Sequence, residues 1–200
     1  MPVASLITLI MVLIIGYYNG ITVVKSGLPS FIITLGSLFM IRGFTIAISK
    51  IITGRTQIGG IEESKGFNIM SSVFSNHLTI AGTNFPISIF WWMLFGVLGY
   101  FLLKHTQFGN WIFATGASQE SAKLMGIPVQ KVKISLFMLT AFCSWFIAVT
   151  QVTTFGGADV LRGEQKEFIA IIAVVIGGTL LTGGYGSIIG AMIGALIFGI

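Results

Sequence analysis

Charged side chains are scarce in this sequence. Asp, Glu, Lys and Arg make up 8% of its 200 residues, whereas soluble globular proteins carry about 25%. Hydrophobic residues reach 54%, and the mean hydropathy is +0.96. So few charges cannot cover a water-facing surface, and most side chains must therefore face lipid. The composition excludes an ordinary soluble domain and indicates a polytopic membrane protein.

The residues that catalysis and metal binding require are also missing. Cys143 is the only cysteine, and His77 and His105 lie far apart, so neither His-x-x-x-His nor Cys-x-x-Cys spacing occurs. No nucleophile elbow, zinc-protease motif or paired carboxylate lies on a predicted helix face. No lysine follows Lys166, so the glycines at 178–184 cannot form a nucleotide-binding P-loop. We predict no catalytic residue, no metal ligand and no cofactor bound by this chain.

Both ends of the sequence lack the usual terminal signals. The chain starts Met1-Pro2-Val3 without a basic segment, which argues against a cleavable signal peptide. It stops at 194–200 in the middle of an apolar run. We expect residues 1–200 to form a single transmembrane domain that is truncated at both ends. The net charge of +5 is attributed to cationic membrane loops rather than to nucleic-acid binding.

Apolar runs of membrane-spanning length are plentiful, since about 20 residues cross the hydrocarbon core. A further run of only about 14 residues is short for a crossing and is followed by glycines, which is typical of broken transporter helices. The sequence predicts an all-α polytopic membrane protein with about five to six transmembrane or partly broken helices. The four strong runs are 6–18, 30–49, 86–103 and 134–151, and the short run is 168–181.

Two polar connections separate these runs, at 51–85 and 155–167. Connections as long as 51–85 are uncommon unless they bind something, and we expect turns and short surface helices there. Arg42 interrupts the second apolar run, where a central charge costs about 2.5–3.5 kcal/mol. It either snorkels toward the headgroups or faces a polar path or partner inside the bundle.

Glycines cluster near the end of the chain. Those spaced four residues apart on one helix face allow close backbone approach between helices. This pattern predicts tight packing inside the subunit, with a dimer seam as the alternative. The helix-break and packing glycines are Gly177, Gly178, Gly183, Gly184, Gly186, Gly190 and Gly194.

One short charged stretch, 117–133, lies between long apolar runs. Ser118 can cap the start of a helix. The negative charge of Glu120 suits the positive N-terminal end of the helix dipole, and the positive charge of Lys123 suits its C-terminal end. Gly126 fits the left-handed backbone position that follows a helix. About seven helical residues are too few to be stable alone in water, so this helix needs a surface to dock on. The predicted docking helix comprises Ser118, Gln119, Glu120, Ser121, Ala122, Lys123, Leu124, Met125 and Gly126.

Orientation follows weakly from charge. In a topology where successive connections alternate between the two sides of the membrane, five cations lie on each side. Lys104, Lys131 and Lys133, however, lie next to the ends of their membrane spans. The positive-inside rule then favours a cytoplasmic location for the 104–133 connection.

From Leu28 onward the sequence resembles the permease subunit of bacterial ABC importers for ribose-type and other simple sugars. The blocks that carry the resemblance occur in order over nearly the whole chain. They are LPSFIITLG from Leu28, IRG from Ile41, TQFG from Thr106, ATGA from Ala114, SAKLMGI from Ser121, IAIIAVVIGGT from Ile169 and GGYGS from Gly183.

The resemblance implies a translocation pore in the bacterial inner membrane, formed with a second permease subunit as a homodimer or heterodimer. Two cytoplasmic ATPase subunits would carry ATP and Mg, and an extracytoplasmic sugar-binding protein would dock on 51–85 and 155–167. Residues 118–126 would be the ATPase-coupling helix. The sequence departs from the family where Ser118 replaces Asn and Glu120-Ser121-Ala122 replaces Glu-Ala-Ala, and its members are longer at both ends.

The alternatives are a branched-chain amino acid or nucleoside permease of the same superfamily, and a passive channel or structural membrane subunit. The coupling role predicts that Glu120→Lys or Ala122→Trp uncouples ATP hydrolysis from uptake.

Overall fold

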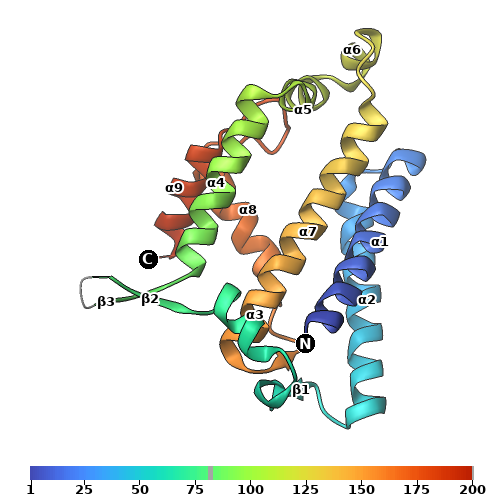
Figure 1. The fold of residues 1–200 in the computed structure, drawn as a ribbon. Coiled ribbons are helices and arrows are strands. Elements are labelled where there is room, and N and C mark those ends of the chain that lie inside the picture. The colour runs from blue at the N-terminus through green and yellow to red at the C-terminus, as the bar shows by residue number, and fades with distance from the viewer. Residues whose placement is uncertain (81–82, 200) are drawn as a thin grey trace. The chain divides into compact units, whose positions relative to one another are not determined.

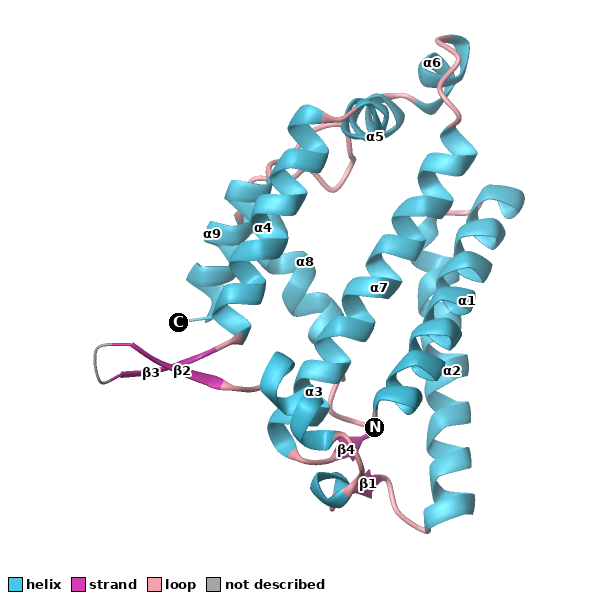
Figure 2. Cartoon of the chain, viewed as in Figure 1, coloured by secondary structure: helices cyan, strands magenta, loops and turns pink. Residues whose placement is uncertain are grey.

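Helices dominate the computed structural model, which describes residues 1–80 and 83–199, and its short strands are confined to the connections (Figures 1 and 2). In these described ranges, four helices are long and apolar enough to cross a membrane, judged by length and composition. They are α1 (Pro2–Ser26), α2 (Ser30–Thr53), α4 (Ser88–His105) and α7 (Val129–Phe155). The predicted fold class, an all-α polytopic membrane protein, is confirmed.

The chain divides into two compact units. The first contains residues 1–89 and 133–162, and the second contains residues 90–132 and 163–200. Helix α1, helix α2, the long polar connection and most of α7 therefore belong to the first unit. Most of α4 belongs to the second, with α5 (Gln107–Ala117), α6 (Gln119–Leu124), α8 (Lys166–Ile176) and α9 (Ile188–Gly199).

Helices α1 and α7 of the first unit pack closely because α1 carries glycines at the crossing. Gly16 and Gly20 are buried, and a Cβ on Gly16 would lie 2.7 Å from the Cβ of Ala141 and 3.0 Å from the carbonyl oxygen of Phe137. A Cβ on Gly20 would lie 3.1 Å from the Cα of Ile134. Four-residue spacing puts the two glycines on one face, and that face meets α7 backbone.

Two polar contacts fix these helices further. The indole Nε1 of Trp145 on α7 donates to the carbonyl oxygen of Ser5 on α1 at 2.9 Å. Between α1 and α2, the Ser37 hydroxyl donates to Asn19 Oδ1 at 2.6 Å. Such bonds between transmembrane helices are worth about 0.6 kcal/mol on average.

Helix α2 buries none of its 24 residues inside the chain. Its large apolar side chains remain open, for example Phe39 at 65% and Phe44 at 63% exposure. A water-soluble monomer rarely shows a contiguous apolar face of this size. The surroundings of α2 must therefore be lipid or another membrane-embedded chain.

The two polar connections of the first unit meet each other. Strand β1 (Gln57–Ile58) pairs antiparallel with β4 (Ala158–Asp159), with Gln57 opposite Asp159. The amide of Ile61 also donates to the carbonyl oxygen of Gly156 at 3.2 Å. The predicted surface helix is present as α3 (Phe67–Phe74), beside the short 3-10 turn η1 (Ile61–Glu63). The two loops, about 100 residues apart in sequence, thus form one surface.

A second strand pair lies in the same connection. Strand β2 (His77–Ile80) is antiparallel to β3 (Thr83–Pro86). The sequence predicted turns and short surface helices between 51 and 85, and the strands β1, β2 and β3 correct that prediction. They are short enough to leave the fold class unchanged.

In the second unit, α9 uses two faces for two neighbours. The side chain of Met192 lies where a Cβ on Gly96 of α4 would be, and Ile188 Cδ1 would lie 3.2 Å from a Cβ on Gly99. Gly190 and Gly194 instead meet the backbone of α8 at Gly177 and Ala173. Helix α8 has 11 residues, or about 16 Å of length, which is roughly half of a bilayer core.

The α1–α7 contact yields a stability prediction. Replacing Gly16 by Val forces a branched side chain against α7 backbone, and overpacking of this kind costs about 1–3 kcal/mol. We expect a lower thermal unfolding midpoint for the purified full-length protein. The matched control is Gly36→Val on α2, where an added Cβ meets nothing within 4 Å. Equal midpoints for the two variants would contradict the packing role of Gly16.

Candidate functional site

The candidate site is built around α6, and it begins with the helix that precedes it. Helix α5 starts at Thr106, whose hydroxyl accepts from the amide of Gly109 at 3.2 Å. It ends at Ser118, whose extended backbone (φ −155°, ψ 115°) breaks the helical path. The sequence analysis assigned no helix to 107–117, so α5 is an addition to the predicted architecture.

Helix α6 is short and has a stop signal at each end. The Ser118 hydroxyl accepts from the amide of Ser121 at 3.3 Å, which is the expected N-cap geometry. At the other end Gly126 has φ 79°, its amide donates to the Lys123 carbonyl oxygen, and the Ile127 amide donates to the Ala122 carbonyl oxygen. These two bonds form a Schellman motif. The helix proper covers 119–124, within the predicted 118–126.

Exposure divides the residues of α6 into two sets. Ala122 is fully buried within the chain, at 0% exposure, so it is part of the packing and not of an open face. Leu124 and Met125 are instead 90% and 68% exposed, and Glu120 and Lys123 are exposed beside them. An apolar pair this open at a helix end costs free energy in water. It is the part of α6 available for a partner.

This geometry changes the choice of test residue on α6. Ala122→Trp would place an indole in a fully buried position, so its effect would report on folding rather than on docking. Glu120→Lys remains informative because Glu120 is exposed.

The predicted glycines lie in and around the loop that joins α8 to α9. Gly178, with φ 83°, closes α8 by the same Schellman pattern, since its amide donates to Val175 and the Thr179 amide donates to Val174. Ser187 caps α9 by accepting from the Gly190 amide at 3.0 Å. Within the loop, the Leu180 amide donates to the Tyr185 carbonyl oxygen at 3.1 Å.

The remaining glycines make close contacts. Gly190 and Gly194 pack on α8, and Gly186 packs on the side chain of Thr179. These contacts are all within the subunit. Gly183 and Gly184, both with positive φ, lie against the end of α5.

Two residues at that α5 contact were not singled out by the sequence analysis as contact residues, namely Gly116 and Ala117. A Cβ on Gly116 would lie 2.6 Å from the amide nitrogen of Gly184, and a Cβ on Gly184 would lie 3.0 Å from the Cα of Ala117. The spacing of either glycine along the chain gives no hint of the other. Only the fold brings them together.

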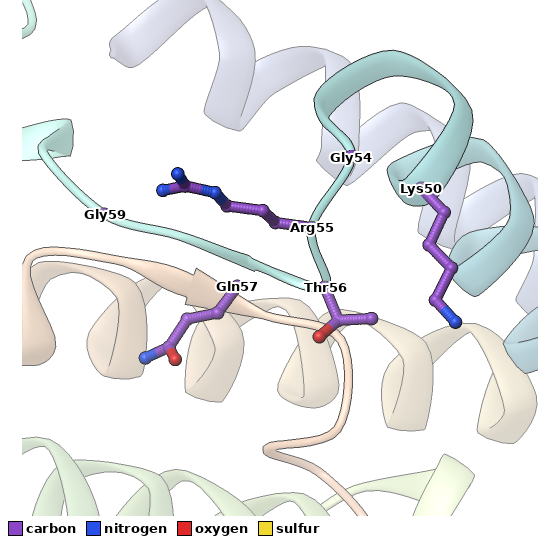
Figure 3. A pocket seen from close by; sticks show the side chains of 6 residues that line it. All are labelled: Lys50, Gly54, Arg55, Thr56, Gln57 and Gly59. Atoms are coloured by element: carbon purple, nitrogen blue, oxygen red, sulfur yellow. The ribbon is translucent and has the colours of Figure 1, made fainter.

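A pocket of about 550 Å³ lies in the first unit, at the end of α2 (Figure 3). Arg55 extends toward Gly59, whereas Lys50 points away from it, so the two cations do not converge on a single point. Lys50 and Arg55 in its lining place positive charge beside the surface formed by the β1–β4 pair. Its lining residues are Lys50, Gly54, Arg55, Thr56, Gln57 and Gly59.

The other candidate residues stay apart from this site. Arg42 is half-buried in α2, in the first unit, and it takes part in an interaction with another residue. Within residues 1–80 and 83–199, no three His, Cys, Asp or Glu side chains gather in a group that could hold a metal ion. The end of α5 thus meets the α8–α9 loop through backbone contacts, and α6 presents an exposed apolar pair at its end, Leu124 and Met125.

Comparison with known proteins gives a consistent result. The family described as "Branched-chain amino acid transport system / permease component" matches residues 1–200. No solved structure matches the chain significantly.

Three curated relatives illustrate the similarity. The ribose import permease protein of Haemophilus influenzae is 29% identical over 201 residues, covering 100% of this chain and 59% of the relative. The fructose import permease protein of Bifidobacterium longum is 30% identical over 97% of this chain and 57% of its own length. The autoinducer 2 import system permease protein of Photorhabdus laumondii is 33% identical over 100% of this chain and 58% of its own length. This chain thus spans less than two thirds of the relatives it matches.

Thr115, next to Gly116 on α5, provides a prediction about stability. It is 7% exposed, and its hydroxyl has no hydrogen-bond partner among the described residues. Thr115→Val removes that hydroxyl at nearly constant volume, so we expect the free energy of unfolding to rise by about 1 kcal/mol. Thermal unfolding of the full-length protein measures it.

Thr153→Val is the matched control for Thr115→Val. Thr153 is equally buried at 4% exposure, but its hydroxyl donates to the Val149 carbonyl oxygen at 2.9 Å. Removing a satisfied hydroxyl should give no gain. If both variants shift the midpoint in the same direction and by the same amount, the unsatisfied hydroxyl of Thr115 is not a source of instability.

Proposed function

This chain belongs to the family of branched-chain amino acid transport system permease components, and from that premise we propose that it is the membrane-spanning permease subunit of an ATP-binding-cassette importer. Its substrate is a simple sugar of the ribose type. Matched relatives named as ribose and fructose import permeases support the sugar. The observation that carries the transporter assignment is α6, a doubly capped helix with Leu124 and Met125 exposed between two apolar helices.

The division of labour follows from the chemistry of the chain. The sequence has no phosphate-binding loop, so ATP and Mg bind separate ATPase subunits, and this chain is not an enzyme. Residues 118–126 form the coupling helix, which docks on such a subunit on the cytoplasmic side. ATP can move the permease only if it favours one arrangement of that helix over another.

The opposite side of the membrane receives the substrate. The surface joined by the β1–β4 pair, with Lys50 and Arg55 at its edge, is the docking site for an extracytoplasmic sugar-binding protein. A second permease subunit completes the pore, and the apolar face of α2 supplies surface for lipid or for that subunit. The protein is a multi-pass component of the inner membrane.

A second substrate class is favoured by one observation, namely that the matching family is described as a branched-chain amino acid transport system. The test is uptake by proteoliposomes that contain the full-length permease, its ATPase subunits and its binding protein. We expect ATP-dependent uptake of radiolabelled ribose and none of leucine. Uptake of leucine alone would support the second class, and ATP-independent flux of either would contradict the importer.

Docking of α6 is tested separately by a single exposed residue. Leu124→Asp puts a charge on the 90% exposed apolar position, where binding would have to desolvate it. We expect the ATPase subunit to be lost from the detergent-purified complex and uptake to fall at least tenfold, because an interface anchor is typically worth 2 kcal/mol or more.

The control for Leu124→Asp is Ile51→Asp, at an 82% exposed position at the end of α2. It introduces the same charge on a helix of the first unit instead of on α6 and should leave the ATPase subunit bound. Retention of the ATPase by Leu124→Asp would rule out α6 as the docking helix.

A further inference from the structure

The α8–α9 loop is in direct backbone contact with the end of α5, immediately before the coupling helix, inside the second unit. Gly116 and Ala117 end α5, and Ser118 is the only residue between them and α6. A Cβ on Gly183 would lie 2.9 Å from the carbonyl oxygen of Gly116, and a Cβ on Gly184 would lie 3.2 Å from the Cβ of Ala117. We call these four residues, Gly116, Ala117, Gly183 and Gly184, the glycine joint.

Close backbone contact makes the joint stiff. Gly116 is exposed overall, but the side on which its Cβ would lie is filled by the Gly184 amide nitrogen at 2.6 Å. No rotatable side chain separates the two segments there. A displacement of the α5–α6 junction toward the loop cannot be absorbed by a change of rotamer, because packed contacts of this kind shift between discrete arrangements instead of deforming.

Both sides of the joint are internally rigid. On one side, α6 is held by the Ser118 cap and the Schellman motif at Gly126. On the other, the Gly183 amide donates to the Leu180 carbonyl oxygen at 3.1 Å, and Gly178 and Ser187 tie the loop to its two helices. The backbones of α8 and α9 then touch at Gly177 and Gly190. Backbone contacts therefore join the end of α5, which leads directly into α6, to the α8–α9 hairpin.

We propose that the glycine joint transmits displacement of the coupling helix to the α8–α9 hairpin, with Gly116 and Gly184 as positioning residues for transport. This inference rests on the proposed docking of α6 on an ATPase subunit. It adds that the element moved by α6 is the short α8–α9 hairpin and not one of the long membrane-spanning helices. Spatial contact alone does not demonstrate coupling, so the test must measure coupling itself.

Gly116→Ala is the decisive variant because it isolates the joint. Gly116 has helical backbone, so alanine favours α5 by up to about 1 kcal/mol of helix propensity, and the only new group is a Cβ directed at the Gly184 amide. In the complete complex we expect ATPase subunits to remain bound, while sugar uptake per ATP hydrolysed falls roughly tenfold, within the usual range of coupling between sites. Gly36→Ala, a helical glycine with open space around it, should leave that ratio unchanged.

A second readout follows the hairpin directly and does not depend on transport. Leu181 in the α8–α9 loop is 79% exposed, and Leu181→Cys gives a single accessible thiol in a complex whose native cysteines, Cys143 included, are replaced by alanine. Its maleimide-labelling rate is measured in the full complex with and without ATP plus vanadate. We expect a nucleotide-dependent rate with the native joint and a nucleotide-independent rate with Gly116→Ala. A purely structural role would change the basal rate and leave the dependence on nucleotide intact.

The outcomes separate this inference from the proposed function. Absence of ATP-dependent uptake in the unaltered complex, or retention of the ATPase by Leu124→Asp, rejects the proposed function. If those tests succeed and Gly116→Ala keeps normal coupling, or if Leu181→Cys labels at one rate in all nucleotide states, the joint does not transmit the motion. If Gly116→Ala fails to assemble, a nucleotide-independent labelling rate in the native-joint complex still overturns the inference.

Discussion

Close backbone contact at glycine positions is the constraint on which the packing of this protein depends. Apolar helices gain nothing from leaving lipid for one another, so their association requires tight van der Waals contact and a few hydrogen bonds. Gly16 and Gly20 provide that contact between α1 and α7, and Gly190 and Gly194 provide it between α9 and α8. Larger residues at these positions would separate the helices by the width of a side chain. The short hairpin α8–α9 has few other means of staying together.

The same reasoning explains where the chain is left open. Helix α2 has no buried residue, although it is among the longest apolar helices. Its exposed phenylalanines and isoleucines are stable beside lipid or beside a second membrane chain, and they would be a liability in water. Helix α6 is the converse case, because its open apolar pair lies in a charged, glycine-punctuated segment outside the spans. The apolar face of α2 is suited to contact within the membrane, and the exposed pair at the end of α6 is suited to contact with a protein outside it.

In the proposed role, the chain transmits conformational change to and from its partners. A six-residue helix such as α6 has too few internal hydrogen bonds to persist alone, so caps and packing of Ala122 maintain it. This makes it a rigid body of small size attached through the single extended residue Ser118. The loop carrying Gly183 and Gly184 meets the chain just before that residue, so a push on α6 has a nearby recipient. The connections paired through β1 and β4 form a separate surface in the first unit.

The sequence by itself determined the membrane environment, the four long spans, the capped helix at 119–124 and the permease family, because these depend on composition, hydrophobic run length and local capping residues. It placed Ser118 and Gly126 in their roles, since caps involve neighbours within a few residues. It did not reveal α5, the strand pairs, the burial of Ala122 or the contact of Gly116 with Gly184. Helix α5 and the β2–β3 pair are local elements, whereas the β1–β4 pair joins Gln57 to Asp159 and the glycine contact joins residue 116 to residue 184, which lie far apart in sequence. Only the tertiary structure decides such pairs, because backbone proximity between distant segments leaves no period or spacing along the chain.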